Sequence, residues 1–232
     1  MKTILRLLND LLFLIYPQVC EICGNVLSEH EDQICSKCLY ELPKTNFHSV
    51  IDNPVNQLFW GKVKINSATS YFFFRKGSKF RTLIHKLKYS GKKEIGSELG
   101  KRFGGQLAKS EHFKDIDIII PVPLHPEKLK ERGYNQSNWL AKGISKTMNK
   151  MVDNSSLCRK KYTDTQTKKN RQERWENVKS AFEIIDVENL KNKHVLLIDD
   201  VITTGATLEA CASKILEIEN TKVSIATIAM AA

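Results

Sequence analysis

Two neighbouring carboxylates lie between an apolar run and a turn rich in hydroxyl groups. The stretch is HVLLIDDVITTGATLEAC, residues 194–211, and its acids are Asp199 and Asp200. Residues 195–198 predict a buried strand, and open α/β sheets bind ligands beyond the carboxyl ends of such strands. We therefore expect Asp199 and Asp200 to emerge at the carboxyl end of this strand, beside a ligand.

The turn after the acids has the residue types of a phosphate socket. Its residues are Thr203, Thr204, Gly205, Ala206 and Thr207. Backbone N–H groups at the start of a helix, three hydroxyls and the helix dipole together favour a phosphate monoester. Gly205 has no side chain to block close approach of the ligand.

The acid pair itself requires hydrogen-bond donors. Two carboxylates about 6 Å apart repel by roughly 3 kcal/mol at an effective dielectric near 20, and vicinal sugar hydroxyls or Mg²⁺ would offset that repulsion. A plain alternative is an acidic strand end beside a helix cap, which accounts for one aspartate but not for the whole series. The pattern favours a site for a sugar phosphate.

Four of the six cysteines form two closely spaced pairs near the amino terminus. Cys20 and Cys23 stand in CEIC, and Cys35 and Cys38 stand in CSKC. Two C-x2-C turns supply a tetrahedral S4 site, which Zn²⁺ prefers, and the alternatives are an iron–sulfur cluster or two disulfides. No secretory signal is expected, which argues against disulfides. Because protein would fill all four positions, we expect a structural zinc whose binding contributes on the order of 10 kcal/mol or more to folding.

Strands and helices alternate through the rest of the chain. Apolar runs predict strands at 67–74, 116–122, 181–185, 195–198 and 222–229, and helical periods predict helices at 79–91, 94–109, 135–148 and 207–219. This alternation implies right-handed crossovers and a mainly parallel sheet flanked by helices. The predicted fold class is therefore α/β, in one domain over residues 59–232.

Residues 1–58 are predicted to form a small amino-terminal module that contains the four cysteines. Before the cysteines, apolar residues recur at helical spacing between Ile4 and Ile15 and predict an amphipathic helix. This helix is expected to dock on its own protein, on a partner or on a membrane surface.

The chain of 232 residues is basic, with a formal net charge of +10 and a pI near 9.3. That balance suits polyanionic partners such as nucleic acid or phosphorylated metabolites, and it equally suits a lysine-rich protein kept soluble by its charge. No apolar run approaches the roughly 20 residues that span a bilayer, so no transmembrane segment is expected.

Several stretches resemble known motifs. IDDVITTGAT, residues 198–207, is similar to the motif with which type I phosphoribosyltransferases bind 5-phosphoribosyl 1-pyrophosphate (PRPP). PVPLHPEKLKERGYNQS, residues 121–137, stands where that family has its pyrophosphate loop. Together with the cysteine pairs and QERWENVKSAF, residues 172–182, it resembles the ComF family over about residues 15–228.

The resemblance implies a type I phosphoribosyltransferase-like fold with an added zinc-binding module. It also implies that Asp199 and Asp200 contact the ribose 2- and 3-hydroxyls and that residues 203–207 hold the 5-phosphate, with Mg²⁺ bridging ligand oxygens. Basic residues that could bind pyrophosphate are Lys128, Lys130 and Arg132 in the first loop and Lys168, Lys169, Arg171 and Arg174 in a mobile loop. Some purine-using members carry an acid where this chain has Thr203, which weakens a purine acceptor and leaves the acceptor unidentified.

The family further implies uptake and processing of transforming DNA on the cytoplasmic side. The implied partners are a DNA-translocating ATPase or helicase and other DNA-uptake proteins, and any membrane association would be made through them. Two classes of function stay open: an active phosphoribosyltransferase, or a silent adaptor of the same fold that binds single-stranded DNA. Trp60, Tyr71 and residues 72–74 are aromatics that could stack on bases, although they fit a core better.

Overall fold

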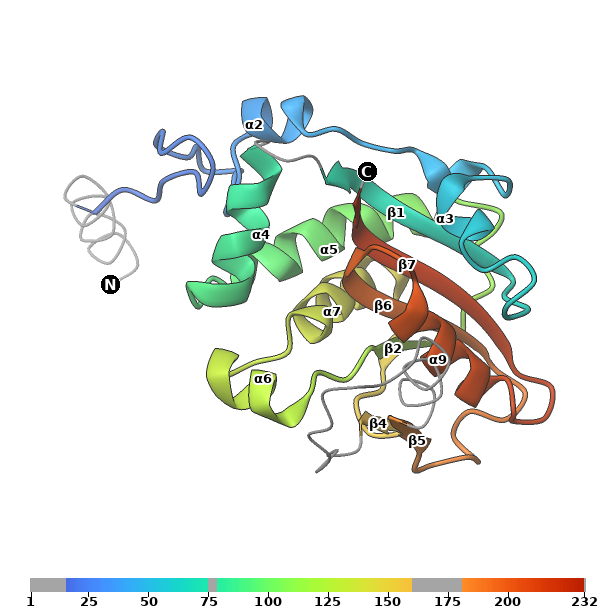
Figure 1. Ribbon diagram of the computed structural model, residues 1–232. Coiled ribbons are helices and arrows are strands. Elements are labelled where there is room, and N and C mark those ends of the chain that lie inside the picture. The colour runs from blue at the N-terminus through green and yellow to red at the C-terminus, as the bar shows by residue number, and fades with distance from the viewer. Residues whose placement is uncertain (1–15, 75–78, 160–180, 232) are drawn as a thin grey trace, which may run out of the picture.

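A computed structural model describes residues 16–74, 79–159 and 181–231 and has a five-stranded parallel sheet at its centre (Figure 1). The strand order is β1-β7-β6-β2-β3. The strands are β1 (Ser67–Phe74), β2 (Ile118–Pro121), β3 (Met151–Val152), β6 (His194–Ile202) and β7 (Lys222–Ala231). All neighbouring pairs in this sheet run parallel. The predicted α/β class with a mainly parallel sheet is therefore confirmed.

Apolar side chains bury both faces of the sheet. In β6, Leu196 and Ile198 belong to the core on one face, while Val195 and Leu197 belong to the core on the other. Since alternate residues of a strand point to opposite faces, a strand buried on both sides needs a continuous apolar run. This is the pattern that the sequence shows before the acid pair.

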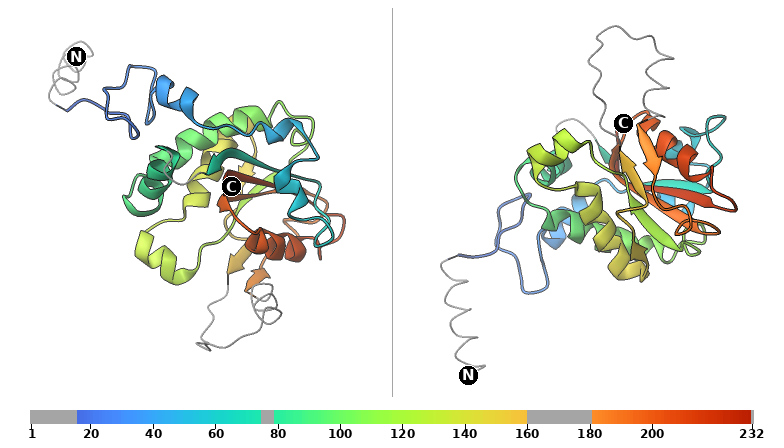
Figure 2. Two further views of the ribbon diagram at one scale, coloured as in Figure 1. Left: turned by 45° about the horizontal axis from the view of Figure 1, so that its top comes forward. Right: turned by 90° about the horizontal axis from the view of Figure 1, so that it is seen from below.

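Helices cover each face, as Figures 1 and 2 show. The helices on the first face are α4 (Lys79–Tyr89), α5 (Glu94–Leu107) and α7 (Gln136–Met148), and those on the second are α3 (Pro54–Gln57) and α9 (Ala206–Ile215). The four helices predicted from apolar periods are thus present, with their ends shifted by a few residues. Helical spacing was sufficient to find them because each buries one stripe against the sheet.

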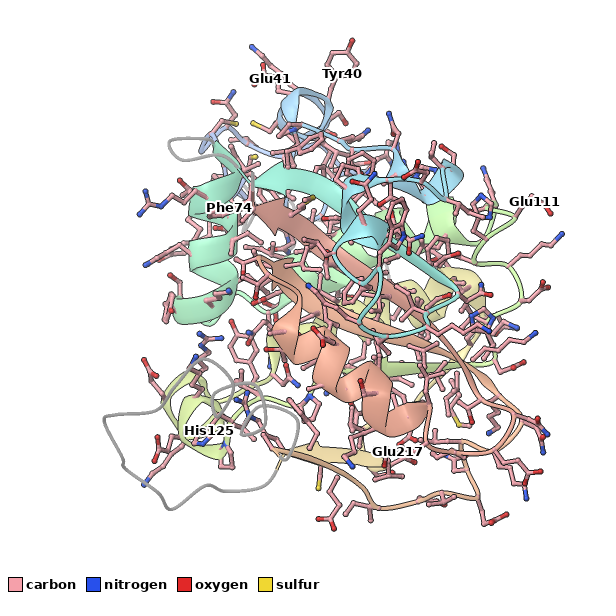
Figure 3. All side chains as sticks on the ribbon, turned by 45° about the vertical axis from the view of Figure 1, so that its right-hand side comes forward. Tyr40, Glu41, Phe74, Glu111, His125 and Glu217 are labelled. Carbon is pink, nitrogen blue, oxygen red and sulfur yellow. The ribbon has the colours of Figure 1, made fainter. Side chains whose placement is uncertain are left out.

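Short capping signals position the segment between β2 and α7. Helix α6 (Pro126–Arg132) begins after His125, whose ring Nδ1 accepts a hydrogen bond from the Glu127 backbone, and ends at Gly133 with φ 75° (Figure 3 labels His125). Asn135 then caps α7 and donates its side-chain amide to the Val122 carbonyl at 2.9 Å. The start of α7 is thereby held at the end of β2.

Strand β6 is longer than the sequence predicts. We expected it to end before Asp199, but it extends to Ile202 and includes both acids. The reason is that β7 continues to pair with β6, with Asp199 opposite Thr227, whereas pairing with β2 ends at Ile198. The predicted strand end was therefore wrong, although both acids do lie beyond the last residue paired with β2.

The strand predicted at 181–185 does not join the central sheet. It is β5 (Phe182–Ile184), and it pairs antiparallel with β4 (Leu157–Arg159) in a separate two-stranded sheet. The alternation of Phe182, Glu183 and Ile184 specifies a strand but not its partner, and the edge position next to β2 is taken by β3. The local partner explains why β5 lies outside the main layer.

The amino-terminal segment runs along the outer edge of β1, with backbone hydrogen bonds from Thr45 to Tyr71 and from Phe73 to Pro43. It contains α2 (Ser36–Glu41) and the short 3-10 helix η1 (Phe47–Ser49), and a bridge between Lys44 and Phe72 ties it to β1. Tyr40 projects from α2 away from the body of the molecule (Figure 3). The amphipathic helix predicted between Ile4 and Ile15 lies outside the described residues. Within the described ranges, no helix has the length and apolar content needed to cross a membrane.

Helices α5 and α7 meet along glycines. A Cβ on Gly100 would overlap the Leu140 carbonyl of α7, and one on Gly143 would come within 2.8 Å of the Gly100 Cα. Backbone therefore packs directly against backbone at this crossing. The contact matters for the site because α7 carries residues that reach the acid pair.

We predict that Gly100→Ala lowers the free energy of unfolding by about 3 kcal/mol, because the added methyl has no space and forces the helices apart. Gly105→Ala on the same helix is the control: a Cβ there has nothing within 4 Å. That change should be neutral or stabilise by roughly 0.5–1 kcal/mol, since alanine is the better helix former. Urea unfolding of both variants measures the difference, and equal effects would contradict the close approach of α5 and α7.

Candidate functional site

Asp199 faces the start of α7. Its Oδ1 accepts hydrogen bonds from the Ser137 hydroxyl at 3.0 Å and from the Asp200 backbone N–H at 2.8 Å. The side chain is half-buried, so one side is open to an incoming group. The Ser137 bond exists because Asn135 fixes the first turn of α7 beside β2.

Asp200 is buried, with 6% of its surface exposed, and it is held by donors from three segments. Its Oδ2 accepts from Lys88 Nζ at 2.8 Å and from Gln136 Nε2 at 2.9 Å, and its Oδ1 accepts from the Val201 N–H at 2.6 Å. Lys88 comes from α4 and Gln136 from α7. The two carboxylates thus collect a lysine, an amide and a hydroxyl from elements far apart in the sequence.

The surroundings of Asp199 raise its pKa. Desolvation and the neighbouring Asp200 charge raise the pKa of Asp199, and the hydrogen bonds from the Asp200 backbone and Ser137 only partly offset them. Asp199 is therefore protonated at a higher pH than an ordinary aspartate. A cation or hydroxyl donors placed against the pair would favour the ionised state.

Gln136 adds an acceptor to this site. Its side chain is 3% exposed, and its Oε1 finds no hydrogen-bond partner among the residues that the structure describes. A buried carbonyl without a partner costs about 1–3 kcal/mol. A ligand hydroxyl or a metal-bound water at the acid pair would satisfy it.

The loop after β6 forms a small hollow of about 60 Å³, lined by Asp199 and by residues 201–208. Gly205 has φ 80°, a conformation that favours glycine, and begins α9 without a side-chain cap. The Phe59 ring lies beneath it, 3.3 Å from where a Cβ would stand. The loop therefore presents an uncapped helix start next to the acid pair, which is a favourable place for an anion.

Arg132 is held at the end of α4. Its guanidinium lies 5.1 Å from the centre of the Tyr89 ring, and one of its amines donates to the Tyr89 hydroxyl at 3.4 Å. Tyr89 directly follows Lys88, so α4 holds both this arginine and Asp200. Lys128 and Lys130 are exposed on α6. Arg171 and Arg174, with Lys168 and Lys169, lie outside the described residues.

Separately, the four amino-terminal cysteines come together in one cluster. The sulfur atoms of Cys20, Cys23, Cys35 and Cys38 lie within 4.8 Å of one another, and Cys23 and Cys35 are 3.7 Å apart. A tetrahedral ion with metal–sulfur bonds of about 2.3 Å needs sulfurs about 3.8 Å apart. All four cysteines are free, not disulfide-bonded. The geometry fits a metal site and contradicts the alternative of two disulfides.

Comparison with known proteins shows what the chain is similar to. Residues 140–232 match the model of the phosphoribosyl transferase domain. DNA utilization protein YhgH of Escherichia coli O157:H7 is 31% identical over 137 residues, which cover 58% of this chain and 60% of that protein, so the chain spans less than two thirds of its length. Competence protein F of Haemophilus influenzae is 29% identical over 193 residues, covering 82% of this chain and 74% of that protein. The chain is thus similar to ComF and YhgH proteins and carries a match to the phosphoribosyl transferase domain.

Solved structures also align with this chain. A glutamine PRPP amidotransferase from B. subtilis, complexed with ADP and GMP, has a TM-score of 0.42 and 17% identity, over 62% of this chain and 30% of that one. The phosphoribosyltransferase domain of this chain rests on the match to the family model, which covers α7, β6, α9 and β7.

The sequence predicted the place of some residues of this candidate site and not of others. The structure brings Asp199, Asp200 and residues 203–207 together at one end of β6, as predicted from their adjacency. It also places Lys88 on Asp200, a contact for which the only signal was a lysine on the apolar stripe of α4. Gln136 and Ser137 stand in the stretch assigned to pyrophosphate, yet they bind the acids. Such contacts span more than 60 residues and leave no periodic pattern.

We predict that Asp199→Asn raises the free energy of unfolding at pH 8 by about 1–2 kcal/mol, a discounted value because the side chain is partly exposed. Because the pKa of Asp199 is raised in the folded protein, the contribution of this residue to stability is fully present below the ordinary aspartate pKa near 4 and is lost as pH rises through the raised value. Asparagine keeps the acceptor oxygen but does not ionise, so the difference between the proteins should nearly vanish at pH 4.

Urea unfolding at both pH values measures this effect. Asp52→Asn is the control, because Asp52 is exposed and its carboxylate only accepts a hydrogen bond from Gln57. An Asp199→Asn variant that is no more stable than wild type at pH 8 would show that the acid pair is not under repulsion.

Proposed function

We propose that this protein binds PRPP with Mg²⁺ and acts as a phosphoribosyltransferase. The observation that supports this proposal most directly is the pairing of Asp199 and Asp200 with an uncapped helix start at residues 205–206, all at the end of β6. The two carboxylates suit vicinal hydroxyls, and the helix start suits a phosphate. A ribose 5-phosphate carries both groups.

Each part of the site then has one task in binding. Asp199 and Asp200 accept hydrogen bonds from the ribose 2- and 3-hydroxyls, and the backbone N–H groups and hydroxyls of residues 203–207 bind the 5-phosphate. Arg132, with Arg171 and Arg174 from the second basic loop, binds the pyrophosphate. Mg²⁺, when bound, neutralises charge on the pyrophosphate and the acid pair. The proposed site therefore combines two acidic residues for the ribose with arginines for the pyrophosphate.

The proposed reaction breaks the bond between carbon 1 of the ribose and the pyrophosphate oxygen, and forms a bond from carbon 1 to a nitrogen of the acceptor. The electron pair of the broken bond leaves with pyrophosphate, so the arginines stabilise the negative charge that develops there. Thr203 in place of an acid disfavours a purine acceptor, and the acceptor is left open.

We further propose that the cysteine cluster binds one structural Zn²⁺ and belongs to an amino-terminal module over residues 1–58, with the transferase domain over 59–232. Four thiolates in tetrahedral range fill the coordination of zinc and leave no position for a substrate. We therefore propose that the metal stabilises the fold of the amino-terminal module and takes no part in the reaction.

The biological role that we propose comes from the family. Relatives are named competence protein F and DNA utilization protein, so we place this protein in the uptake and processing of transforming DNA, on the cytoplasmic side. A DNA-translocating ATPase or helicase and other DNA-uptake proteins are its proposed partners. The net charge of +10 suits contact with nucleic acid.

Isothermal titration with PRPP and Mg²⁺ tests the ligand. Wild type and the exposed-loop variant Asp52→Asn should give equal affinities, and Asp200→Asn should weaken binding by about tenfold or more, since a bond to a charged group contributes about 1.5–3 kcal/mol. Release of pyrophosphate across a panel of nitrogen bases then tests turnover. Heats from Asp200→Asn equal to those of wild type would contradict the proposed site.

A second function, an adaptor without turnover that binds single-stranded DNA, is favoured by the surroundings of Trp60. Of the aromatics considered for stacking, Tyr71 and Phe72 are buried, whereas Trp60 is 58% exposed beside a hollow of about 460 Å³ lined in part by Lys62 and Lys64.

Trp60→Ala should weaken DNA binding by about 1–3 kcal/mol per stacked base, and affinity should fall steeply with salt. Fluorescence titration with a labelled oligonucleotide measures both, and Tyr40→Ala, at an exposed tyrosine on α2, is the control. Unchanged binding by Trp60→Ala would rule out this surface.

A further inference from the structure

Glu21 connects the cysteine cluster to helix α4. It stands between Cys20 and Cys23, and only 9% of its surface is exposed. Its Oε2 pairs with Lys86 Nζ at 2.9 Å and its Oε1 with Lys92 Nζ at 2.9 Å, while Lys86 also donates to the Glu21 carbonyl at 2.7 Å. Burial disfavours the ionised form of Glu21, but the two lysines outweigh it and lower its pKa. A charged pair so placed holds the cluster and α4 in one arrangement.

The other side of α4 reaches the acid pair. Lys88, two residues after Lys86, makes the 2.8 Å ion pair with Asp200. The next residue, Tyr89, holds Arg132, and the Tyr134 hydroxyl donates to the Leu87 carbonyl at the same helical turn. Figure 1 shows α4 between the cysteine segment and α6. One turn of helix therefore contacts the cysteine module, the acids and the pyrophosphate loop.

The helix is rigid enough to transmit a displacement. Phe80, Leu83 and Leu87 lie on its inner side and are fully buried. Packed elements of this kind shift as units and do not deform continuously. If Glu21 moves, Lys86 and Lys88 move with it.

The position of Glu21 depends on the fold of the cysteine knuckle. The turn is closed by the Gly24 N–H on the Cys20 carbonyl at 2.9 Å, and Glu21 itself donates its N–H to the Gln33 carbonyl at 2.9 Å, close to the second cysteine pair. Segments of this type order around their metal. Loss of the metal would therefore release Glu21 from its place against α4.

We propose that α4 couples the two sites: metal in the four-cysteine cluster fixes Glu21, Glu21 fixes α4, and Lys88 on α4 then sets the affinity of the acid pair for its anionic sugar-phosphate ligand. Lys88 is a positioning residue that offsets the negative charge of Asp200, so that a polyanion can approach. This inference rests on the proposed PRPP site and concerns its regulation.

The coupling has a reciprocal consequence. If metal increases the affinity for PRPP by some factor, PRPP must increase the affinity for the metal by the same factor. A merely structural role for Glu21 or Lys88 would change stability without linking the two ligands. A mutual effect of metal and PRPP on each other's affinity therefore distinguishes coupling through α4 from a purely structural role.

The experiment uses the full chain and begins with metal analysis, which should find one zinc per chain in protein purified under reducing conditions. PRPP–Mg²⁺ affinity is then measured for wild type, Glu21→Gln, Lys88→Met and Asp32→Asn. Asp32 is the matched control, because it joins the same cysteine module to Lys101 on α5 at 3.2 Å and does not contact α4. Thermal melts establish that each variant is folded.

We expect Glu21→Gln and Lys88→Met to weaken PRPP binding about five- to tenfold, within the usual range of coupling between sites, and Asp32→Asn to leave it unchanged. Saturating PRPP–Mg²⁺ should slow loss of zinc to a chelator in wild type by a similar factor, and this protection should disappear in Lys88→Met. Lys88 is far from the cysteines in sequence, so that loss reports transmission through α4.

The outcomes separate the two proposals. Wild type that holds zinc but does not bind PRPP overturns the proposed function and this coupling with it. Wild type that binds PRPP with an affinity unaffected by Glu21→Gln, or with zinc loss unaffected by PRPP, overturns the coupling alone. Equal weakening by Asp32→Asn would show a general loosening of the module and would also reject the route through α4.

Discussion

Two carboxylates on consecutive residues of one strand constrain the rest of this structure. Asp199 and Asp200 repel each other, and the strand itself supplies one backbone N–H to each carboxylate, from Asp200 and from Val201. Further donors must come from elsewhere, and they come from α4 and from the start of α7. The capping of α7 by Asn135, the close packing of α5 on α7 and the placement of α4 all serve to deliver those groups. A free site with charges balanced in this way is ready for a ligand that brings hydroxyls and a cation.

The need to balance the charge of the acid pair also involves the cysteine module. The segment built around four thiols adds Leu27 and Ile34 to the core on the α4 side of the sheet, and Glu21 within it is buried against Lys86 of α4 and against Lys92, which follows that helix. Helix α4 is therefore held from outside by this ion-pair network and acts inward on Asp200. In this account the module stabilises the charge arrangement of the sheet's ligand-binding end and does not touch the ligand itself.

Much of this could be predicted from sequence because it is local. The fully apolar residues 195–198 indicated a strand buried on both faces, the spacing of the cysteine pairs indicated a single cluster, and apolar periods located α4, α5, α7 and α9. The missed features depend on partners far along the chain. The extension of β6 to Ile202 required knowledge of β7, the position of β5 required knowledge of β4, and the Lys88–Asp200 pair joins residues from opposite halves of the molecule. Arg171 and Arg174, predicted from a basic run, fall outside the described residues, so their part in the site stays a prediction.

The most direct test of the account is a crystal structure of the protein with PRPP and Mg²⁺ bound. We predict ribose hydroxyls on Asp199 and Asp200, the 5-phosphate against residues 203–207, and Gln136 Oε1 supplied with a donor. A ligand bound elsewhere, or ribose hydroxyls that contact neither carboxylate at saturating PRPP, would contradict the claim that these two carboxylates hold a sugar phosphate.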